Sequence, residues 1–502
     1  MTQRQKRRIY FVAGVALLFV LAASFNPFNS DLLNDEEQEE AGLPHGLEAI
    51  RDTGELVVLT VESPTTLQQR GSGETGYEVD LTSALADELG VDVRYKVFDD
   101  IPRLVTAIES GQGHIAAPGM TQREINLESG ANPLAIGPAY KAVRHVMVCR
   151  RDGERPKSLE AVNDLSIGVV AGSGNEQTLE QKREDNPALN WKSYDVNSGL
   201  RLAEKVYEQE LDCAVIDSNV AAIARRLHPE LVTTFELGQQ DRQLSWAIAP
   251  QSRDLNDYLK PWFQSAHQDG LLYDLDEQYY GHLNEFDYVD ISVFRRRIDS
   301  RLPRYEPLFR EAAGEFNLDW TMLAAQGYQE SHWEADARSP TGVRGLMMLT
   351  QPTAREVGIE NRLDPEQSIV GGATYLDRMY DRLPDEATGY DRLWLAMAAY
   401  NVGYGHLRDA MTLARREGLN PYKWRIIKTM LPRLTKKQYY STVRYGYARG
   451  YEPVRYVKRI REYDTVLTNR VERPEQPPFD PDPVPTEIEA ELQVESPASG
   501  TP

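Results

Sequence analysis

The chain has 502 residues, which is too long for one compact domain and predicts two or three. Hydrophobic residues make up 41% and charged residues 26%, so the composition is globular and excludes a fibrous, collagen-like or largely disordered chain. The formal net charge of -21 argues against a nucleic-acid partner, because binding phosphates requires a basic surface.

The charge is distributed unevenly along the chain. Residues 293–473 carry 30 Lys or Arg against 23 Asp or Glu, whereas the rest of the chain carries 26 against 54. A basic C-terminal region beside a strongly acidic remainder indicates that the two parts meet different partners.

The first 25 residues are typical of an export signal. An uncharged, mostly apolar run over 9–25 follows four basic residues, Arg4, Lys6, Arg7 and Arg8. We expect a signal peptide cleaved near residues 22–24. The alternative is a retained inner-membrane anchor, since the run is just short of the ~20 residues that span a bilayer. In either case the chain leaves the cytoplasm, and the acidic segment 26–45 is predicted to be a solvated linker.

Short apolar runs alternate with helical patterns between residues 46 and 285, which predicts an α/β domain of two lobes. The run LVVLTV at 56–61 has the composition of a buried strand. The next segment, 77–90, places Leu81, Leu85 and Leu89 at helical spacing and leads into a strand at 91–98. The region therefore opens with a β-α-β unit.

The chain has two cysteines, Cys149 and Cys213, which excludes a disulfide scaffold and a four-cysteine zinc site. Both lie in apolar, strand-like runs. A disulfide between them and a pair of buried thiols are both compatible with these positions.

Five motifs of the region 46–285 resemble, in their order, the periplasmic solute-binding proteins of amino-acid uptake. They are GELVVLT at 54–60, GYEVDLTSALADELG at 76–90, GQGHIAAPGMT at 111–121, SLEAVNDLSIGVVAGSG at 158–174 and LDCAVIDSNVA at 211–221. The resemblance implies two lobes that close on a ligand such as an amino acid or a murein peptide.

In such a cleft, the resemblance implies that Arg123 clamps the ligand's carboxylate and that Asp217 pairs with its amine. An arginine suits a carboxylate because two parallel N–H groups match its two oxygens. The residues alone also allow a solvated loop position for Arg123 and a helix N-cap for Asp217.

Residues 293–473 have a helical pattern, and one carboxylate lies on an apolar face. Asp319 is placed to cap a helix on which Leu323, Gly327 and Glu330 share one side at four- and three-residue spacing. A carboxyl group held there would have a raised pKa, because burial disfavours its charged form. Spacing alone also allows an ordinary exposed glutamate near a helix end.

The motifs around and after Glu330 resemble the lytic transglycosylases related to goose-type lysozyme. They are ESHW at 330–333, ARS at 337–339, GLMML at 345–349, AYNVG at 399–403 and YV at 456–457. With the upstream region and the export signal, the chain is similar to the membrane-bound lytic murein transglycosylases. The resemblance implies a mainly α, lysozyme-like domain that cleaves the β-1,4 bond between N-acetylmuramic acid and N-acetylglucosamine and leaves a 1,6-anhydromuramoyl end.

The resemblance implies that Glu330 is the catalytic acid and base. It implies that the residues contacting the glycan strand are Ser339, Met347, Met348, Tyr400, Asn401 and Tyr456. Met348 departs from the pattern, since many relatives have glutamine there. Tyr400 and Tyr456 also repeat with apolar neighbours at helical spacing, so a role in core packing alone is the other interpretation.

The number of carboxylates bears on the reaction. Hydrolytic glycosidases use two, whereas one firm acid is present here, because Glu334 and Asp336 are expected in a solvated loop. His332 points away from Glu330 on the helix and is expected to be structural. No metal site or cofactor is indicated. The alternatives to a lyase are a hydrolytic muramidase and a non-catalytic murein-binding sensor.

The proline-rich, acidic tail at 474–502 is predicted to be disordered. For the whole chain we expect a periplasmic protein, peripheral on the inner face of the outer membrane. Its solute-binding-like domain at 46–285 would bind a ligand or modulate the catalytic domain at 293–473.

Overall fold

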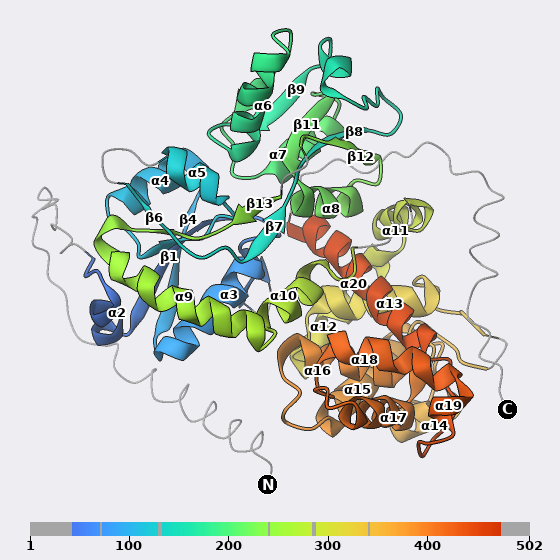
Figure 1. Ribbon diagram of the computed structural model, residues 1–502. Helices are drawn as coiled ribbons and strands as arrows, with labels where there is room; N and C mark the ends of the chain where they lie inside the picture. Colours follow the sequence, from blue (N-terminus) through green and yellow to red (C-terminus); the bar gives the residue numbers. More distant parts are fainter. Residues whose placement is uncertain are drawn as a thin grey trace, which may run out of the picture. The chain divides into compact units, whose positions relative to one another are not determined.

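The computed structural model describes residues 43–70, 73–128, 133–238, 241–283, 288–339 and 342–472 (Figure 1). These residues form an α/β region of two lobes followed by a helical domain, which confirms the predicted fold class. The predicted export signal at 1–25 and the tail at 474–502 lie outside the described residues. Among the described helices, none is both long enough and apolar enough to cross a membrane.

Lobe one is built on a sheet with the strand order β4-β1-β5-β14-β6. Strand β1 pairs in parallel with β4 and β5, and six of its seven residues are buried, as expected for a strand covered on both faces. The elements of this lobe are α2 (Leu47–Thr53), β1 (Glu55–Val61), β2 (Gln68–Arg70), β3 (Gly73–Thr75), α3 (Tyr77–Leu89), β4 (Asp92–Phe98), α4 (Ile101–Glu109), β5 (Ile115–Ala116), α5 (Gln122–Glu128), β6 (Ala135–Ile136), β14 (Ala247–Ile248), η2 (Pro250–Ser252), α9 (Arg253–Gln268) and α10 (Leu271–Tyr280).

Lobe two is inserted between β7 (Lys141–Val143) and β13 (Arg242–Leu244), which pair antiparallel where the chain leaves lobe one and returns. Its sheet has the order β10-β9-β11-β8-β12, and β8 runs antiparallel to both neighbours. The elements of this lobe are β8 (His145–Arg150), η1 (Leu159–Val162), β9 (Ile167–Val170), α6 (Gly174–Asp185), β10 (Lys192–Tyr194), α7 (Gly199–Tyr207), β11 (Cys213–Asp217), α8 (Ser218–Leu227) and β12 (Leu231–Glu236).

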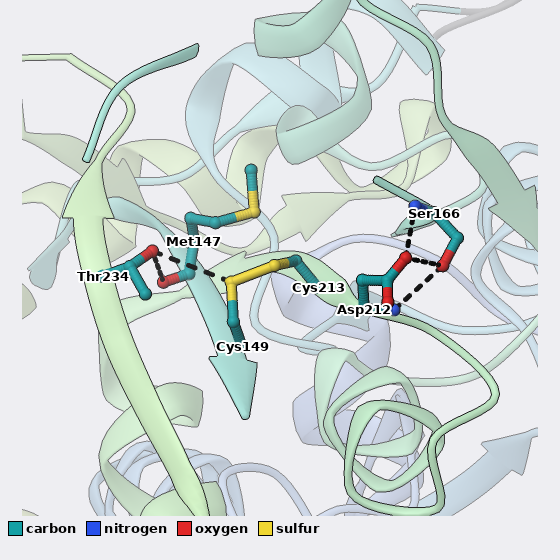
Figure 2. Close-up of a disulfide and its surroundings, with 6 residues drawn as sticks. All are labelled: Met147, Cys149, Ser166, Asp212, Cys213 and Thr234. Carbon is teal, nitrogen blue, oxygen red and sulfur yellow. Dashed lines mark hydrogen bonds between the residues drawn. A yellow bond between two sulfur atoms is a disulfide. The ribbon is translucent and has the colours of Figure 1, made fainter. Parts of the chain in front are cut away.

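A disulfide joins the two central strands of lobe two. Cys149 on β8 and Cys213 on β11 are directly opposite each other in the antiparallel pair, and both are fully buried (Figure 2). The structure therefore decides between the two states that the sequence left open. Disulfides persist in oxidising compartments, which agrees with the expected export of the chain.

The helical domain is arranged around one buried helix, α13, which packs against α12 and α20. The elements of this domain are α11 (Tyr288–Ser300), η3 (Leu302–Arg304), α12 (Glu306–Phe316), α13 (Trp320–Ser331), α14 (Gln351–Glu356), α15 (Pro365–Arg382), α16 (Gly389–Val402), α17 (Tyr404–Arg416), α18 (Trp424–Met430), η4 (Leu431–Thr435), α19 (Lys437–Tyr440) and α20 (Tyr451–Glu472).

Helix α13 is buried around most of its circumference. All residues from 321 to 328 are buried, whereas a surface helix would bury only one stripe. Asp319 occupies the N-cap position but makes no capping hydrogen bond, which corrects the expected role of its side chain. Its carboxylate instead accepts from Thr321 and pairs with Arg70 at 3.4 Å, so other partners satisfy the charge.

The turn that begins at Gly345 lies against this core. Gly345 has a φ of +82°, and a Cβ there would approach the carbonyl oxygen of Arg362 to 1.7 Å. Only glycine fits this backbone and this contact. Next in the turn, the N–H of Met347 donates to Ser368 Oγ at 3.1 Å, which fixes the segment carrying Met347 and Met348.

Removing the disulfide should destabilise lobe two. The bridge closes a loop with a sequence separation of 64, for which loop-closure entropy predicts a loss of about 4 kcal/mol in unfolding free energy. We expect the full-length Cys149→Ala/Cys213→Ala variant to unfold in calorimetry at a lower temperature than the parent chain. Reductant should lower the parent's unfolding temperature and leave that of the double variant unchanged. Equal unfolding temperatures for the parent and the double variant would contradict this prediction.

Candidate functional site

Glu330 lies in the last turn of the buried helix α13. The helix ends just beyond it because His332 and Trp333 both adopt left-handed backbone conformations, with φ of 52° and 58°. The indole of Trp333 is buried and donates to the carbonyl oxygen of Ala324 at 2.9 Å. This bond ties the chain after the helix back onto the helix and fixes the position of Glu330.

The carboxyl group of Glu330 has one described hydrogen-bond donor, the hydroxyl of Tyr456 on α20. Tyr456 donates to Glu330 Oε1 at 2.6 Å. The hydroxyl oxygen of Tyr456 in turn accepts from Gln326 Nε2 at 3.1 Å. Gln326 precedes Glu330 by one helical turn. Helix α13 therefore positions both Glu330 and Gln326, and Gln326 orients the Tyr456 hydroxyl that donates to Glu330.

Burial controls the protonation of Glu330. Its side chain keeps an accessible edge, but the surrounding protein atoms desolvate the carboxylate and raise the pKa to about 8. The Tyr456 hydrogen bond acts in the opposite direction and lowers the pKa. Within the described part of the chain, no second carboxylate contributes to the pKa of Glu330. At pH 7 the protonated, neutral form of Glu330 therefore predominates.

Tyr400 and the turn at Met347 complete this cluster. The Tyr400 hydroxyl donates to the carbonyl oxygen of Met347 at 2.9 Å, and its ring lies parallel to that of Tyr456 with centroids 6.5 Å apart. The Met347 side chain is fully buried, with Gly327 and Gly372 close around it. Met347 therefore presents its carbonyl group to Tyr400, whereas its side chain belongs to the core.

The remaining candidates from the sequence lie at the surface or in turns. Asn401 is exposed at the end of α16, and Met348 is half-buried with a φ of 45°. Ser339 lies in a turn where its Oγ accepts from the N–H of Val343 at 3.3 Å. The contacts described above join Glu330, Tyr456, Tyr400 and the backbone of Met347.

Two polar neighbours of Glu330 in the sequence make other contacts. The ring of His332 packs against Tyr328, and burial lowers the pKa of His332 to about 4. Arg301 donates to the carbonyl oxygen of His332 and pairs with Glu334 at 2.8 Å. These contacts agree with a structural role for His332 and give Glu334 an ion-pair partner.

A second candidate site is the cleft between the two lobes, which Asp217 lines. Asp217 ends β11 and makes no capping bond to α8; instead its Oδ1 accepts from Asn175 Nδ2 at 3.1 Å. Burial, followed by the nearby charge of Glu124, raises the pKa of Asp217. Asp217 is therefore placed at the cleft, where the resemblance implied a contact with a ligand's amine.

The structure does not bring Arg123 into this cleft with Asp217. The guanidinium of Arg123 donates to Gln181 Oε1 at 3.2 Å, and Arg123 is not among the lining residues. The next residue on α5, Glu124, is turned by about 100° and lines the cleft instead. Its carboxylate accepts from the backbone N–H groups of Thr121 and Gly174.

Sequence reasoning missed three residues of these sites. Gln326 could have been found from the sequence, because it lies one turn before Glu330 on the same helix and so shares its face. Glu124 and Asn175 lie in short helices whose start the residue pattern does not define, so no sequence signal distinguishes them from their neighbours. Among the described residues, no group of three or more His, Cys, Asp or Glu side chains is placed to hold a metal ion.

Comparison with known proteins assigns both halves of the chain. Residues 56–282 match the family model of bacterial extracellular solute-binding proteins, family 3, and residues 307–422 match the transglycosylase SLT domain. Among solved structures, the P235GK mutant of ArgBP from T. maritima is similar, with a TM-score of 0.41 and 20% identity over 47% of this chain and 99% of that one.

Relatives span nearly the whole chain. A membrane-bound lytic murein transglycosylase F from Maricaulis maris is 49% identical over 84% of this chain and 92% of its own length. The corresponding protein from Yersinia enterocolitica is 38% identical over 93% of both chains. The chain therefore belongs to the membrane-bound lytic murein transglycosylase F family.

Proposed function

We propose that this protein is a lytic murein transglycosylase in which Glu330 transfers the protons. The observation that carries the proposal is a single carboxyl group that burial keeps neutral at pH 7 and that Tyr456 hydrogen-bonds. Glycan cleavage begins with protonation of the leaving oxygen, so the enzyme needs an acid that is still protonated at its working pH. The family membership supports the same reaction.

In the first half of the reaction, neutral Glu330 donates its proton to the glycosidic oxygen between N-acetylmuramic acid and N-acetylglucosamine. As that bond breaks, the 2-acetamido oxygen or the ring oxygen of the muramic acid stabilises the positive charge developing at C1. Glu330 is left as a carboxylate. The Tyr456 hydroxyl, 2.6 Å from Oε1, stabilises that charge as it forms.

In the second half, the Glu330 carboxylate removes the proton from the C6 hydroxyl of the muramic acid. The C6 oxygen attacks C1 and closes a 1,6-anhydro ring, so no water is consumed. One group serves as acid and then as base, and this use of a single carboxylate fits the absence of a second acid near Glu330 among the described residues.

We further propose that the inter-lobe cleft binds a small ligand, an amino acid or a murein peptide, through Asp217. The half-buried Asp217 carboxylate and the Asn175 amide that donates to it support this proposal. The guanidinium of Arg123 donates to Gln181 and is not among the residues that line the cleft, so this proposal assigns it no contact with the ligand.

The location of the protein is also a proposal. The basic and apolar segment at 1–25, the disulfide and the membrane-bound relatives support an exported protein that acts in the periplasm, peripheral on the inner face of the outer membrane.

Replacing Glu330 by glutamine should abolish cleavage and leave binding. The amide keeps the shape of the side chain but neither donates nor accepts the proton, and positioned acid-base catalysis is worth about 10²–10⁴-fold. Mass spectrometry of digests of purified sacculi should show 1,6-anhydromuramic ends with the parent chain and none with Glu330→Gln. Glu334→Gln, which alters a surface ion pair four residues away, is the matched control and should keep the activity. Reducing muramic ends carrying solvent oxygen would instead show hydrolysis.

The pH profile should report the Glu330 carboxyl group. Because the neutral acid is needed first, kcat/KM should fall as pH rises through a pKa of about 8. Tyr456→Phe removes the hydrogen bond that lowers this pKa, so the alkaline limb should move to higher pH while the rate decreases. In Tyr400→Phe, whose hydroxyl donates to Met347 instead, the limb should stay in place. A downward or absent shift in Tyr456→Phe would contradict the assignment.

Ligand binding in the cleft should stabilise the folded chain through Asp217. A panel of amino acids and murein peptides should contain members that raise the unfolding temperature of the full-length protein by mass action. We expect Asp217→Ala to lose that rise. Arg123→Ala, on the neighbouring surface, should keep it. A flat response of the parent chain to the panel would refute binding, and a response that survives in Asp217→Ala would refute the role of Asp217.

A further inference from the structure

Exposed aromatic side chains are concentrated in one short segment of the helical domain. Among the described residues, six large hydrophobic side chains are exposed, and three of them are tyrosines within seven residues of each other. Tyr445, Tyr447 and Tyr451 are 46%, 55% and 59% exposed. We call these three residues the tyrosine strip. Exposed apolar side chains that are grouped together mark interaction sites, whereas single ones are common on protein surfaces.

The loop that carries the strip is held in shape by two side chains of α17, one buried and one exposed. Asp409 on α17 is only 3% exposed, and its carboxylate accepts from the backbone N–H groups of Arg444, Tyr445 and Gly446 at 2.8–3.1 Å. Arg416 on the same helix donates to the side chain and carbonyl oxygen of Thr442. A buried carboxylate is costly unless it is fully hydrogen-bonded, so Asp409 defines one loop conformation. The tyrosines are therefore exposed by a fixed structure.

Two members of the strip are close along the chain to residues named for the Glu330 site. At one end, Tyr445 lies against Gly405, where an added Cβ would come within 2.7 Å of the tyrosine ring. Gly405 is four residues beyond Asn401. At the other end, Tyr451 opens α20 five residues before Tyr456, which corresponds to about 7.5 Å along the helix axis and a rotation of about 140° around it. A polymer bound at Glu330 would reach the strip by passing over the N-terminal end of α20 and the start of α17.

The chemistry of the strip suits a sugar chain. A tyrosine ring offers an apolar face and a polar hydroxyl tip, which matches a pyranose ring with its C–H face and hydroxyl edge. The remaining loop residues are small, polar or basic, such as Thr442, Arg444 and Gly446, with no aliphatic side chain larger than Val443. Membrane-inserting surfaces combine their aromatics with leucine, phenylalanine or tryptophan, and the strip has none.

We propose that Tyr445, Tyr447 and Tyr451 form an additional glycan-binding subsite, which holds the strand beyond the sugars that contact Glu330. This inference rests on the proposed murein substrate. The strip lengthens the stretch of glycan that the enzyme contacts, so it favours long strands over short fragments.

The test compares strands of different length. In the full-length Tyr445→Ala/Tyr447→Ala/Tyr451→Ala variant, the ratio of kcat/KM on long uncross-linked glycan strands to kcat/KM on a tetrasaccharide should fall about 10-fold, through KM. The control is Tyr273→Ala, a tyrosine 54% exposed on α10, which should keep the parent ratio. The triple phenylalanine variant retains the ring faces and should restore the ratio, which a misfolded loop would not explain.

Binding without turnover separates this proposal from the lyase itself. In the Glu330→Gln background, the triple alanine substitution should weaken co-sedimentation with purified sacculi. Unchanged sedimentation and an unchanged length ratio would overturn the subsite. If the triple alanine variant lost binding to anionic phospholipid vesicles but kept its binding to glycan, the glycan subsite would be overturned and the strip would be a membrane-binding surface. If the parent chain yields no anhydro ends but the strip variant still loses glycan binding, the proposed lyase fails and the subsite stands.

Discussion

The helical domain depends on the burial of α13 around most of its circumference. A helix in that position has no solvated face for its polar groups, so each one needs a partner within the protein. Gln326, fully buried, donates through Nε2 to Tyr456, whereas its Oε1 has no hydrogen-bond partner among the described residues. Ser331 donates to the carbonyl oxygens of Gly327 and Leu346. The side chain of Glu330 is partly accessible to solvent. The surrounding protein atoms nevertheless disfavour its charged form and raise its pKa.

Close packing around α13 explains why this burial is possible. Gly327 has no side chain, and a Cβ there would lie 2.7 Å from the Phe309 ring and 3.3 Å from Met347 Sδ. The neighbouring helix α12 and the turn at Met347 therefore approach the backbone of α13 closely. The same packing that stabilises the domain desolvates its end, so stability and the raised pKa of Glu330 have one physical origin.

The sequence predicted those features whose cause is local. Helical spacing placed Glu330 on the apolar side of its helix, and the alternation of strands and helices gave the two lobes. The choice between Arg123 and Glu124 depends on where α5 begins, and one residue of register turns a side chain by about 100°. The pairing of Cys149 with Cys213 depends on the register between β8 and β11, which are separated by more than 60 residues. The side chain of Asp319 finds Arg70 from a distant hairpin, which no local pattern reveals.

The left-handed pair at His332 and Trp333 fixes the length of α13 as well as its end. One inserted or deleted residue between Gln326 and Glu330 would rotate the carboxyl group about 100° away from Tyr456. It would also detach the Trp333 indole from the Ala324 carbonyl oxygen. Insertions and deletions in this domain should therefore be tolerated in its loops and not between Ala324 and Trp333.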